Sequence, residues 1–249
     1  MGQLDGKVAI VTGAGTGIGK GIAKAFAAEG CAVVVNGRNI ESLNQTVAEV
    51  RDTGGKSHAV QGDVTQEASV KHLFDETVRR YGRVDILVNN AGRVAGGPLD
   101  QLTLEKWNDV LGVNVTGVFL CTREAFRVMK PQGGGRIINI GSLASERPRE
   151  DSAPYTVSKH AVTGLTRSAA LDGRAFGISC GQLNPGNTNV ERRRAAGGRS
   201  ASGRDVGPEP LISVEDMARA ALYMATLPPD ANCLEMTVLP MQQVYLGRG

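Results

Sequence analysis

The sequence predicts an α/β fold in which a doubly wound parallel sheet forms a single domain. Two observations carry this prediction: short apolar runs alternate with longer segments of helical period, and the runs are rich in Val and Ile without polar alternation. Strands that are apolar on both faces are typical of a parallel sheet covered by helices on both sides. Glycine is frequent, with 33 residues among 249, and aromatic residues make up only 4%, which favours a sheet with tight turns.

Seven apolar runs are the predicted strands, and six segments of helical period between them are the predicted helices. The strands are Lys7–Thr12, Ala32–Asn36, Ser57–Gln61, Asp85–Asn89, Arg136–Gly141, Ile178–Leu183 and Leu234–Leu239. The helices are Gly17–Glu29, Ile40–Asp52, Gln66–Tyr81, Thr103–Met129, Ser152–Arg174 and Ser213–Thr226. This alternation implies parallel strands that are joined by right-handed crossovers.

One segment, from about Gly186 to Pro210, has no apolar periodicity and is rich in Gly, Arg and Ser. A loop of that length inside a compact domain is usually either functional or disordered. In a doubly wound sheet, ligands bind beyond the carboxyl ends of the strands, and this loop follows such an end. We therefore expect residues 186–212 to form a lid over a ligand.

Composition excludes several classes of protein. The net charge is +3 and the basic residues are spread along the chain, so we expect no nucleic-acid partner. The four cysteines (Cys31, Cys121, Cys180 and Cys233) form no CxxC pair, which favours isolated reduced thiols and no metal site. No apolar stretch approaches the length of about 18 residues that a bilayer span needs, and the first strand leaves no room for a signal peptide. These features predict a cytoplasmic protein without membrane contact.

A glycine-rich turn follows the first predicted strand directly and leads into the first predicted helix. It reads Thr12-Gly13-Ala14-Gly15-Thr16-Gly17-Ile18-Gly19. Glycines let backbone N–H groups approach a pyrophosphate, which then lies at the positive end of the helix. Glycines also serve purely structural turns, but the strand before and the helix after favour a dinucleotide-binding turn here.

The end of the second predicted strand bears on which dinucleotide binds. A carboxylate there would favour NAD, because it accepts hydrogen bonds from the free ribose hydroxyls. The chain instead has Asn36-Gly37-Arg38, and a guanidinium suits a 2′-phosphate. We therefore expect NADP(H), with NAD(H) as the alternative. Arg38 as a merely solvated loop residue is the competing interpretation, and Thr16 adds no second positive charge.

Tyr155 and Lys159 are four residues apart in a predicted helix, so both project from one face. A phenol holds its proton too tightly for easy exchange at neutral pH. A nearby ammonium and a positive nicotinamide ring favour the phenolate and make the exchange easier. Ser142 ends the preceding apolar run, where its hydroxyl could polarise a carbonyl. The combination indicates proton transfer to or from a carbonyl oxygen.

With these residues considered, the chain resembles the short-chain dehydrogenase/reductase family over essentially its whole length. The matching motifs are Thr12-Gly13-x-x-x-Gly17-Ile18-Gly19, Asp63-Val64, Asn89-Asn90-Ala91-Gly92, Asn114, Ser142, Tyr155-x-x-x-Lys159 and Asn184-Pro185-Gly186. The resemblance implies a Rossmann-type sheet and an oxidoreductase that interconverts a carbonyl and a secondary alcohol by hydride transfer. It implies a catalytic set of Asn114, Ser142, Tyr155 and Lys159, with Tyr155 as general acid and base. In this set Ser142 would stabilise the oxyanion, Asn114 would hold a water in a proton relay, and Lys159 would also bond the nicotinamide ribose.

The resemblance also implies where the cofactor is contacted. Asp63 and Val64 would lie beside the adenine, Asn90 near a ribose, and Thr188 near the nicotinamide carboxamide. The expected cofactor-binding residues are Gly13, Gly15, Thr16, Gly17, Ile18, Gly19, Arg38, Asp63, Val64, Asn90, Ala91, Gly92, Tyr155, Lys159, Pro185, Gly186 and Thr188. A homotetramer or dimer is implied as well, through the helices predicted at Thr103–Met129 and Ser152–Arg174.

Two departures from the family pattern bear on the details. Val190 stands where the family usually has a Thr after Pro185-Gly186, which puts the local cofactor hydrogen bonds in doubt. The common C-terminal Val-Asp-Gly-Gly is absent, and residues 234–240 read Leu-Glu-Met-Thr-Val-Leu-Pro instead. That ending is more similar to the hydroxy-acid and serine dehydrogenases, and to some alcohol dehydrogenases of the family, than to typical 3-oxoacyl-carrier-protein reductases.

The substrate remains open at this stage. The expected lid contains Arg192, Arg193, Arg194, Arg199 and Arg204, and Arg147 and Arg149 follow Ser142 closely. These arginines either attract an anionic substrate, such as a hydroxy acid or an acyl group on a carrier, or are solvated loop residues. The specific alternatives are a 3-oxoacyl-carrier-protein reductase and a 3-hydroxy acid dehydrogenase. A cofactor-sensing binding protein is the alternative without catalysis, although such proteins commonly lose the Tyr or the Lys.

Overall fold

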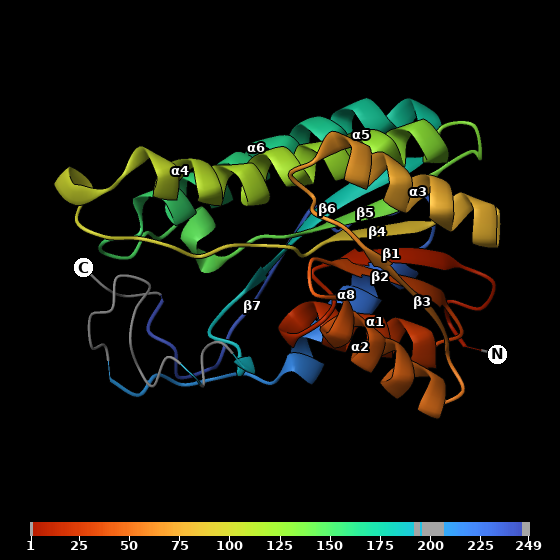
Figure 1. The fold of residues 1–249 in the computed structure, drawn as a ribbon, viewed down its shortest axis with the longest axis horizontal. Coiled ribbons are helices and arrows are strands. Elements are labelled where there is room, and N and C mark those ends of the chain that lie inside the picture. The colour runs from red at the N-terminus through yellow and green to blue at the C-terminus, as the bar shows by residue number, and fades with distance from the viewer. Residues whose placement is uncertain (1, 192–194, 196–206, 246–249) are drawn as a thin grey trace.

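The computed structural model describes residues 2–191, 195 and 207–245. Within these residues seven parallel strands form one sheet in the order β3-β2-β1-β4-β5-β6-β7 (Figure 1). The strands are β1 (Val8–Thr12), β2 (Ala32–Gly37), β3 (Lys56–Gln61), β4 (Ile86–Asn89), β5 (Gly135–Ile140), β6 (Ile178–Pro185) and β7 (Glu235–Val238). The helices are α1 (Gly17–Ala28), α2 (Ile40–Asp52), α3 (Glu67–Tyr81), α4 (Leu104–Leu111), α5 (Val118–Met129), α6 (Ala153–Gly173) and α8 (Val214–Thr226).

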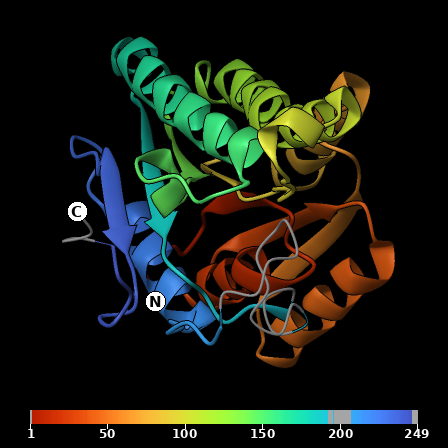
Figure 2. The ribbon, with the colours of Figure 1, turned by 90° about the vertical axis from the view of Figure 1, so that its left-hand side faces the viewer.

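Helices cover both faces of the sheet, as Figures 1 and 2 show. α3, α4, α5 and α6 lie on one face, and α1, α2 and α8 lie on the other. Strand β1 shows why the apolar runs have no polar alternation: Ala9 and Val11 join the core beneath α1, α2 and α8, whereas Ile10 joins the core on the opposite face. The predicted doubly wound parallel sheet is therefore confirmed.

The two outermost strands, β3 and β7, differ from the prediction of burial on both faces. Residues of β7 are alternately exposed and half-buried, and β3 is exposed at both ends. Each of these strands has only one neighbour in the sheet, so the helix layers cover it incompletely. Two-sided burial holds for the strands between them.

The long helix predicted over Thr103–Met129 is interrupted. α4 ends at Leu111, residues Gly112–Gly117 form a π-helical stretch, and α5 begins at Val118. Short π-helical stretches within α-helices are frequently found at functional sites. This one carries Asn114, which is buried.

The segment predicted as a lid is joined to the rest of the domain by two described stems, residues 187–191 and 207–212. The Asn189 backbone N–H donates to the Ile212 carbonyl at 2.9 Å, and the Ile212 N–H donates to the Asn187 carbonyl at 2.8 Å. Residues 192–194 and 196–206, with the five arginines of the expected lid, lie outside the described residues. The two stems are therefore held together beyond the carboxyl end of β6.

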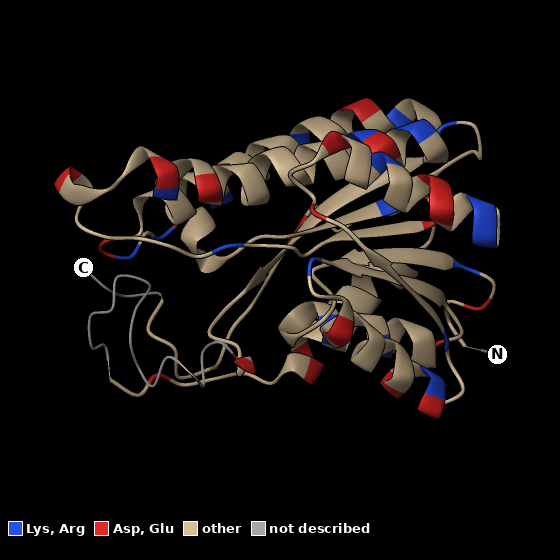
Figure 3. Cartoon of the chain, viewed as in Figure 1, with Lys and Arg blue, Asp and Glu red and all other residues tan. Residues whose placement is uncertain are grey.

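The surface carries charges of both signs. Lys and Arg are interspersed with Asp and Glu along the outer helices in the view of Figure 3. Among the helices that the structure describes, none is long and apolar enough to cross a membrane.

Candidate active site

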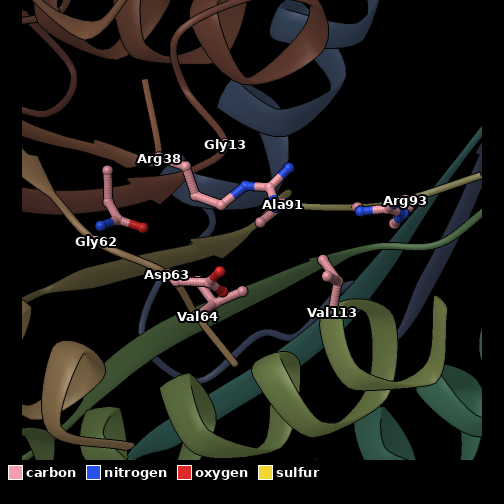
Figure 4. Close-up of a pocket in the computed structure, with 11 residues that line it drawn as sticks. Gly13, Arg38, Gly62, Asp63, Val64, Ala91, Arg93 and Val113 are labelled. Atoms are coloured by element: carbon pink, nitrogen blue, oxygen red, sulfur yellow. The ribbon is translucent and has the colours of Figure 1, made fainter. Parts of the chain in front are cut away.

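The order in which strands are added to the sheet changes side at β1. β2 and β3 are added on one side of β1, and β4 is added on the other side. Such a switch point opens a crevice at the carboxyl ends of the strands. A pocket of about 180 Å³ lies there (Figure 4). Its lining residues are Gly13, Asn36, Gly37, Arg38, Gly62, Asp63, Val64, Ala91, Gly92, Arg93 and Val113. The pocket therefore brings together residues that are far apart in the sequence.

The glycine turn lies so close to the end of β4 that side chains would not fit at two of its positions. Gly13 has φ +63°, and a Cβ there would lie 2.8 Å from the Ala91 Cα. A Cβ on Gly19 would lie 2.3 Å from Asn90 Nδ2. Asn90 Nδ2 donates to the carbonyls of Thr12 (2.9 Å) and Gly13 (3.0 Å). The amide of Asn90 thus holds the turn in place, a supporting contact in addition to the ribose contact expected from the sequence.

The turn presents backbone donors at the start of α1. Thr16 is the N-cap residue, but its side chain caps no backbone N–H, and the first turn of α1 contains no acidic residue. A Cβ on Gly15 would lie 2.3 Å from Ser42 Oγ of α2, so the turn is also closely packed on its other side. The Gly17 N–H donates to Glu191 Oε2 at 3.0 Å. Backbone N–H groups and the helix dipole make this end of α1 suited to an anion.

The adenosine side of the pocket contains Arg38, Asp63 and Val64, as expected. Arg38 is exposed at the rim, and its carbonyl accepts from Gln61 Nε2 at 2.8 Å. Figure 4 shows its guanidinium across the pocket from Asp63. Asp63 Oδ1 accepts from both the backbone N–H and the hydroxyl of Thr65 at 2.9 Å, which fixes the loop after β3. Val64 is buried.

Asn36 supplies a buried acceptor at the wall of the same pocket. Its Nδ2 donates to the Val60 carbonyl at 2.9 Å, whereas its Oδ1 is buried without a partner. An unpaired buried acceptor is costly, and a donor on a bound ligand would remove that cost. Together with the close glycine turn and the exposed cation of Arg38, this acceptor fits an adenine dinucleotide.

Lys159 and Tyr155 of α6 lie near the carboxyl end of β5, and Ser142 follows that strand end in the chain. Tyr155 lies in the first turn of α6, and Lys159 Nζ lies 5.6 Å from the centre of the Tyr155 ring. Lys159 is buried and donates to the Ile140 carbonyl at 2.7 Å, so the ammonium is fixed against the strand end. The Ser142 Oγ accepts from the Ala144 N–H at 3.1 Å, which leaves the hydroxyl proton to be donated elsewhere. The Lys159 ammonium is therefore held beside the Tyr155 ring, and Ser142 stands two residues after the carbonyl that holds it.

Asn114 is held by the backbone of Arg93 rather than turned towards the pocket. Its Oδ1 accepts from the Arg93 N–H at 2.7 Å, and its Nδ2 donates to the Arg93 carbonyl and to Ser158 Oγ, both at 2.9 Å. Both amide hydrogens are therefore used. A water at Asn114 would therefore have to donate to one of its oxygens, Oδ1 or the backbone carbonyl.

The loop after β6 carries Pro185, Gly186 and Thr188 to the same edge of the sheet. Thr188 is buried and its hydroxyl donates to the Gly186 carbonyl at 3.1 Å. Gln243, near the end of the chain, accepts from the Asn187 N–H at 2.8 Å. A Cβ on Gly186 would lie 2.6 Å from that same Gln243 oxygen. The C-terminal segment thus fixes this loop, which the sequence did not reveal.

The predicted site residues are therefore distributed along one edge of the sheet. Of the residues that line the pocket, sequence reasoning did not select Asn36, Gly37, Gly62, Arg93 or Val113. Gly37, Gly62, Arg93 and Val113 each stand next to a selected residue in the sequence, and Asn36 stands two residues before Arg38. Among the described residues no group of three His, Cys, Asp or Glu could hold a metal ion.

Known proteins are similar to this chain in sequence and in fold. The family model described as short chain dehydrogenase matches residues 7–199. A 3beta-hydroxysteroid dehydrogenase of Mediterraneibacter gnavus is 40% identical over 191 residues, which cover 76% of this chain and 69% of that protein. A 3-oxoacyl-[acyl-carrier-protein] reductase of Synechocystis is 40% identical over 187 residues, covering 75% of this chain and 76% of that protein. Among solved structures, a variant of actinorhodin polyketide ketoreductase with NADPH superposes with a TM-score of 0.84 at 31% identity, covering 96% of this chain and 98% of that one.

The family match extends over most of the chain, and the relatives and the structure agree with it. The expected fold and family are confirmed: the chain belongs to the short-chain dehydrogenase/reductase family and is a nicotinamide-dependent oxidoreductase acting on carbonyl and alcohol groups.

Proposed function

We propose that Tyr155 is the general acid and base of this oxidoreductase, that NADP(H) is its physiological cofactor, and that it interconverts a ketone and a secondary alcohol. The observation that carries the proposal is the position of the Lys159 ammonium, beside the Tyr155 ring and at the same sheet edge as the glycine turn. NADPH in the similar ketoreductase supports the choice of cofactor.

The residues of this chain would divide the work as follows. The turn at Gly13–Gly19 and the start of α1 would bind the pyrophosphate, Arg38 the 2′-phosphate, and Asp63 and Val64 the adenine side. When bound, the nicotinamide supplies or accepts the hydride. Pro185, Gly186 and Thr188 would lie against the nicotinamide, on a loop that Gln243 fixes.

The proton would move at the Tyr155 hydroxyl. In reduction, this hydroxyl donates its proton to the carbonyl oxygen as negative charge develops there, and in oxidation the phenolate takes the proton back. Lys159 is fixed beside the ring by the Ile140 carbonyl, so its positive charge is held next to the group that transfers the proton. The Ser142 hydroxyl donates to the same substrate oxygen and stabilises its charge.

Two described arginines near Ser142 in the sequence bear on the substrate class. Of the two described arginines near Ser142, Arg149 is paired with Glu209 at 2.9 Å and donates to Asn187 Oδ1 at 3.0 Å. Arg147 lies over the Tyr245 ring, 6.0 Å from its centre. We therefore propose a substrate of the 3-oxoacyl or 3-hydroxy acid class, with Arg147 as the described cation that would meet an anionic group on it. The hydroxysteroid and carrier-protein relatives make a steroid and a carrier-bound acyl group the first alternatives to test.

We further propose a homo-oligomer, a dimer or tetramer, in the cytoplasm. Apolar side chains are exposed on the helices where the interface was expected: Phe119 on α5 and Val157 and Leu171 on α6. Where exposed apolar side chains form a contiguous surface, that surface commonly marks a protein–protein contact. All four cysteines are free thiols, as expected in a reducing compartment.

A substrate panel with NADPH and NADH in parallel tests the proposal. We expect oxidation of NADPH with a ketone or 3-oxoacyl substrate, and loss of turnover by at least about a hundredfold in Tyr155→Phe, the lower end of the usual effect of removing a general acid. Tyr223→Phe is the matched control, because Tyr223 is exposed on α8 and away from the pocket. Turnover that survives in Tyr155→Phe would refute the assigned role. Cofactor binding without turnover on any substrate would favour a cofactor-sensing protein.

A further inference from the structure

We propose that Glu191 lowers the affinity of this protein for its dinucleotide, because its carboxylate occupies the start of α1 where the pyrophosphate binds. The inference rests on the proposed function, since it assumes that the glycine turn receives the pyrophosphate. The contact that carries it is the hydrogen bond from the Gly17 N–H to Glu191 Oε2, at 3.0 Å.

Glu191 reaches the turn from a stem that pairing with Ile212 holds in place. Asn187 and Asn189 exchange backbone hydrogen bonds with Ile212, and the Asn187 N–H donates to Gln243. Next to Asn189, Val190 lies over the same glycine: a Cβ on Gly17 would lie 3.2 Å from the Val190 Cγ1. The carboxylate is therefore brought to α1 by an ordered segment.

A carboxylate at this position resembles the ligand that the turn is suited to bind. Gly17 is the first residue of α1, so its N–H is one of the backbone groups that no carbonyl of the helix can satisfy. Carboxylate and phosphate oxygens accept from such groups in the same way, and the helix dipole favours both. One N–H cannot serve both acceptors at full strength, so Glu191 must withdraw before the pyrophosphate takes its place.

The surrounding charges make this competition stronger. Lys20 and Lys24 of α1 face the same side of the turn, but both are held by Glu49, at 2.5 and 2.9 Å. The pyrophosphate brings two negative charges of its own, so a neighbouring carboxylate repels it as well as competing with it. The hydroxyl that a Thr would provide to the cofactor is missing at Val190. At residues 190 and 191 the dinucleotide therefore meets an apolar side chain and a carboxylate instead of a hydroxyl donor.

The size of the effect depends on the fraction of molecules in which Glu191 has left the turn, because only these can bind the dinucleotide. The apparent dissociation constant rises in proportion as the competent fraction falls. A charge-assisted hydrogen bond contributes more than a neutral one, but Glu191 is exposed and solvent screens it. We expect Glu191→Gln, which keeps the shape and removes the charge, to tighten dinucleotide binding about three- to thirtyfold.

Isothermal titration calorimetry of the full-length protein tests this, with NADP⁺ and adenosine 2′-phosphate as probes. NADP⁺ places its pyrophosphate on the turn, whereas adenosine 2′-phosphate occupies only the Arg38 side and has no phosphate at the 5′ position. We expect Glu191→Gln and Glu191→Ala to bind NADP⁺ more tightly than the wild type does. Their affinity for adenosine 2′-phosphate should stay within about twofold of the wild-type value, because that probe does not reach Gly17. A thermal melt of each variant checks that the fold is retained.

Glu215→Gln is the control for charge alone. Glu215 is exposed and faces the same side of the turn from the first turn of α8, so its removal changes the net charge equally. NADP⁺ affinity that is unchanged or weaker in both Glu191 variants would overturn the inference, and so would an equal gain in Glu215→Gln or an equal gain for adenosine 2′-phosphate. Dinucleotide that binds equally well to the wild type and all variants would overturn the inference and leave the proposed function standing. A wild type and variants that all fail to bind NADP⁺ would overturn both.

Discussion

Replacing Arg38 by Leu should convert a protein that prefers NADPH into one that no longer distinguishes the two cofactors. Arg38 is the cation at the rim of the adenosine side of the pocket, and the end of β2 carries no carboxylate that would repel a 2′-phosphate. A hydrogen bond to a charged group contributes about 1.5 to 3 kcal/mol, but the exposure of Arg38 lowers this to about 1 to 2 kcal/mol. The loss corresponds to a roughly five- to thirtyfold weaker binding of NADPH.

The assay measures dissociation constants of NADPH and NADH and the kcat/KM for both with one substrate. NADH should be affected by less than about twofold, since its ribose carries no phosphate for the guanidinium. Arg51→Leu is the control, because Arg51 is an exposed residue at the end of α2 and its removal changes the net charge equally. If Arg38→Leu weakens NADPH and NADH alike, the guanidinium contacts the adenosine and not the phosphate. If it changes neither, the assignment of Arg38 is wrong.

Three further predictions concern groups whose contacts the structure defines. Asn114→Ala should lower kcat and also lower the free energy of unfolding by about 2 to 4 kcal/mol, because it leaves both backbone groups of Arg93 without a partner. Denaturant unfolding measures the loss of stability, and a loss of kcat alone would contradict the prediction. Arg136→Met should lower Tm by about 4 to 8 °C in a thermal melt, because the buried guanidinium donates to three carbonyls beyond α8 at 3.0 to 3.2 Å; an unchanged Tm would refute that anchoring role. Burial raises the pKa of the thiols of Cys31, Cys121 and Cys180 to about 12, so a thiol reagent at about pH 8 should label the native protein at Cys233 alone and all four cysteines after unfolding.

Much of the fold could be predicted because its signals are local. Each inner strand is buried on both faces, so its apolar run is continuous and easily recognised, as Ala9, Ile10 and Val11 show. Helix boundaries were also predictable where a capping residue fixes them. The helix predicted at Ile40 begins there because Asn39 Oδ1 accepts from the Ser42 N–H at 2.7 Å.

The π-helical stretch within the helix predicted over Thr103–Met129 could not be predicted in this way. Its residues keep a helical period, and the extra residue in the turn depends on contacts made elsewhere. Asn114 is fixed by the backbone of Arg93 and by Ser158, which is 44 residues further along the chain. The motif match singled out Asn114, but it did not show that the side chain is used to hold the loop after β4.

The glycine turn shows most clearly what a motif leaves undetermined. Its glycines and the helix after it predict which backbone donors an anion can reach, because those donors follow from local geometry. They do not predict which acceptor those donors meet in the free protein. That acceptor is Glu191, 174 residues from Gly17 in the sequence, and only the pairing of the two stems beyond β6 brings it to the turn. The presence of a dinucleotide site is therefore a property of a short motif, whereas its affinity depends on a contact between distant parts of the chain. Two members of one family with the same glycine turn should then differ in cofactor affinity according to the residue at the position that Glu191 occupies here. The Glu191 variants measure that contribution directly.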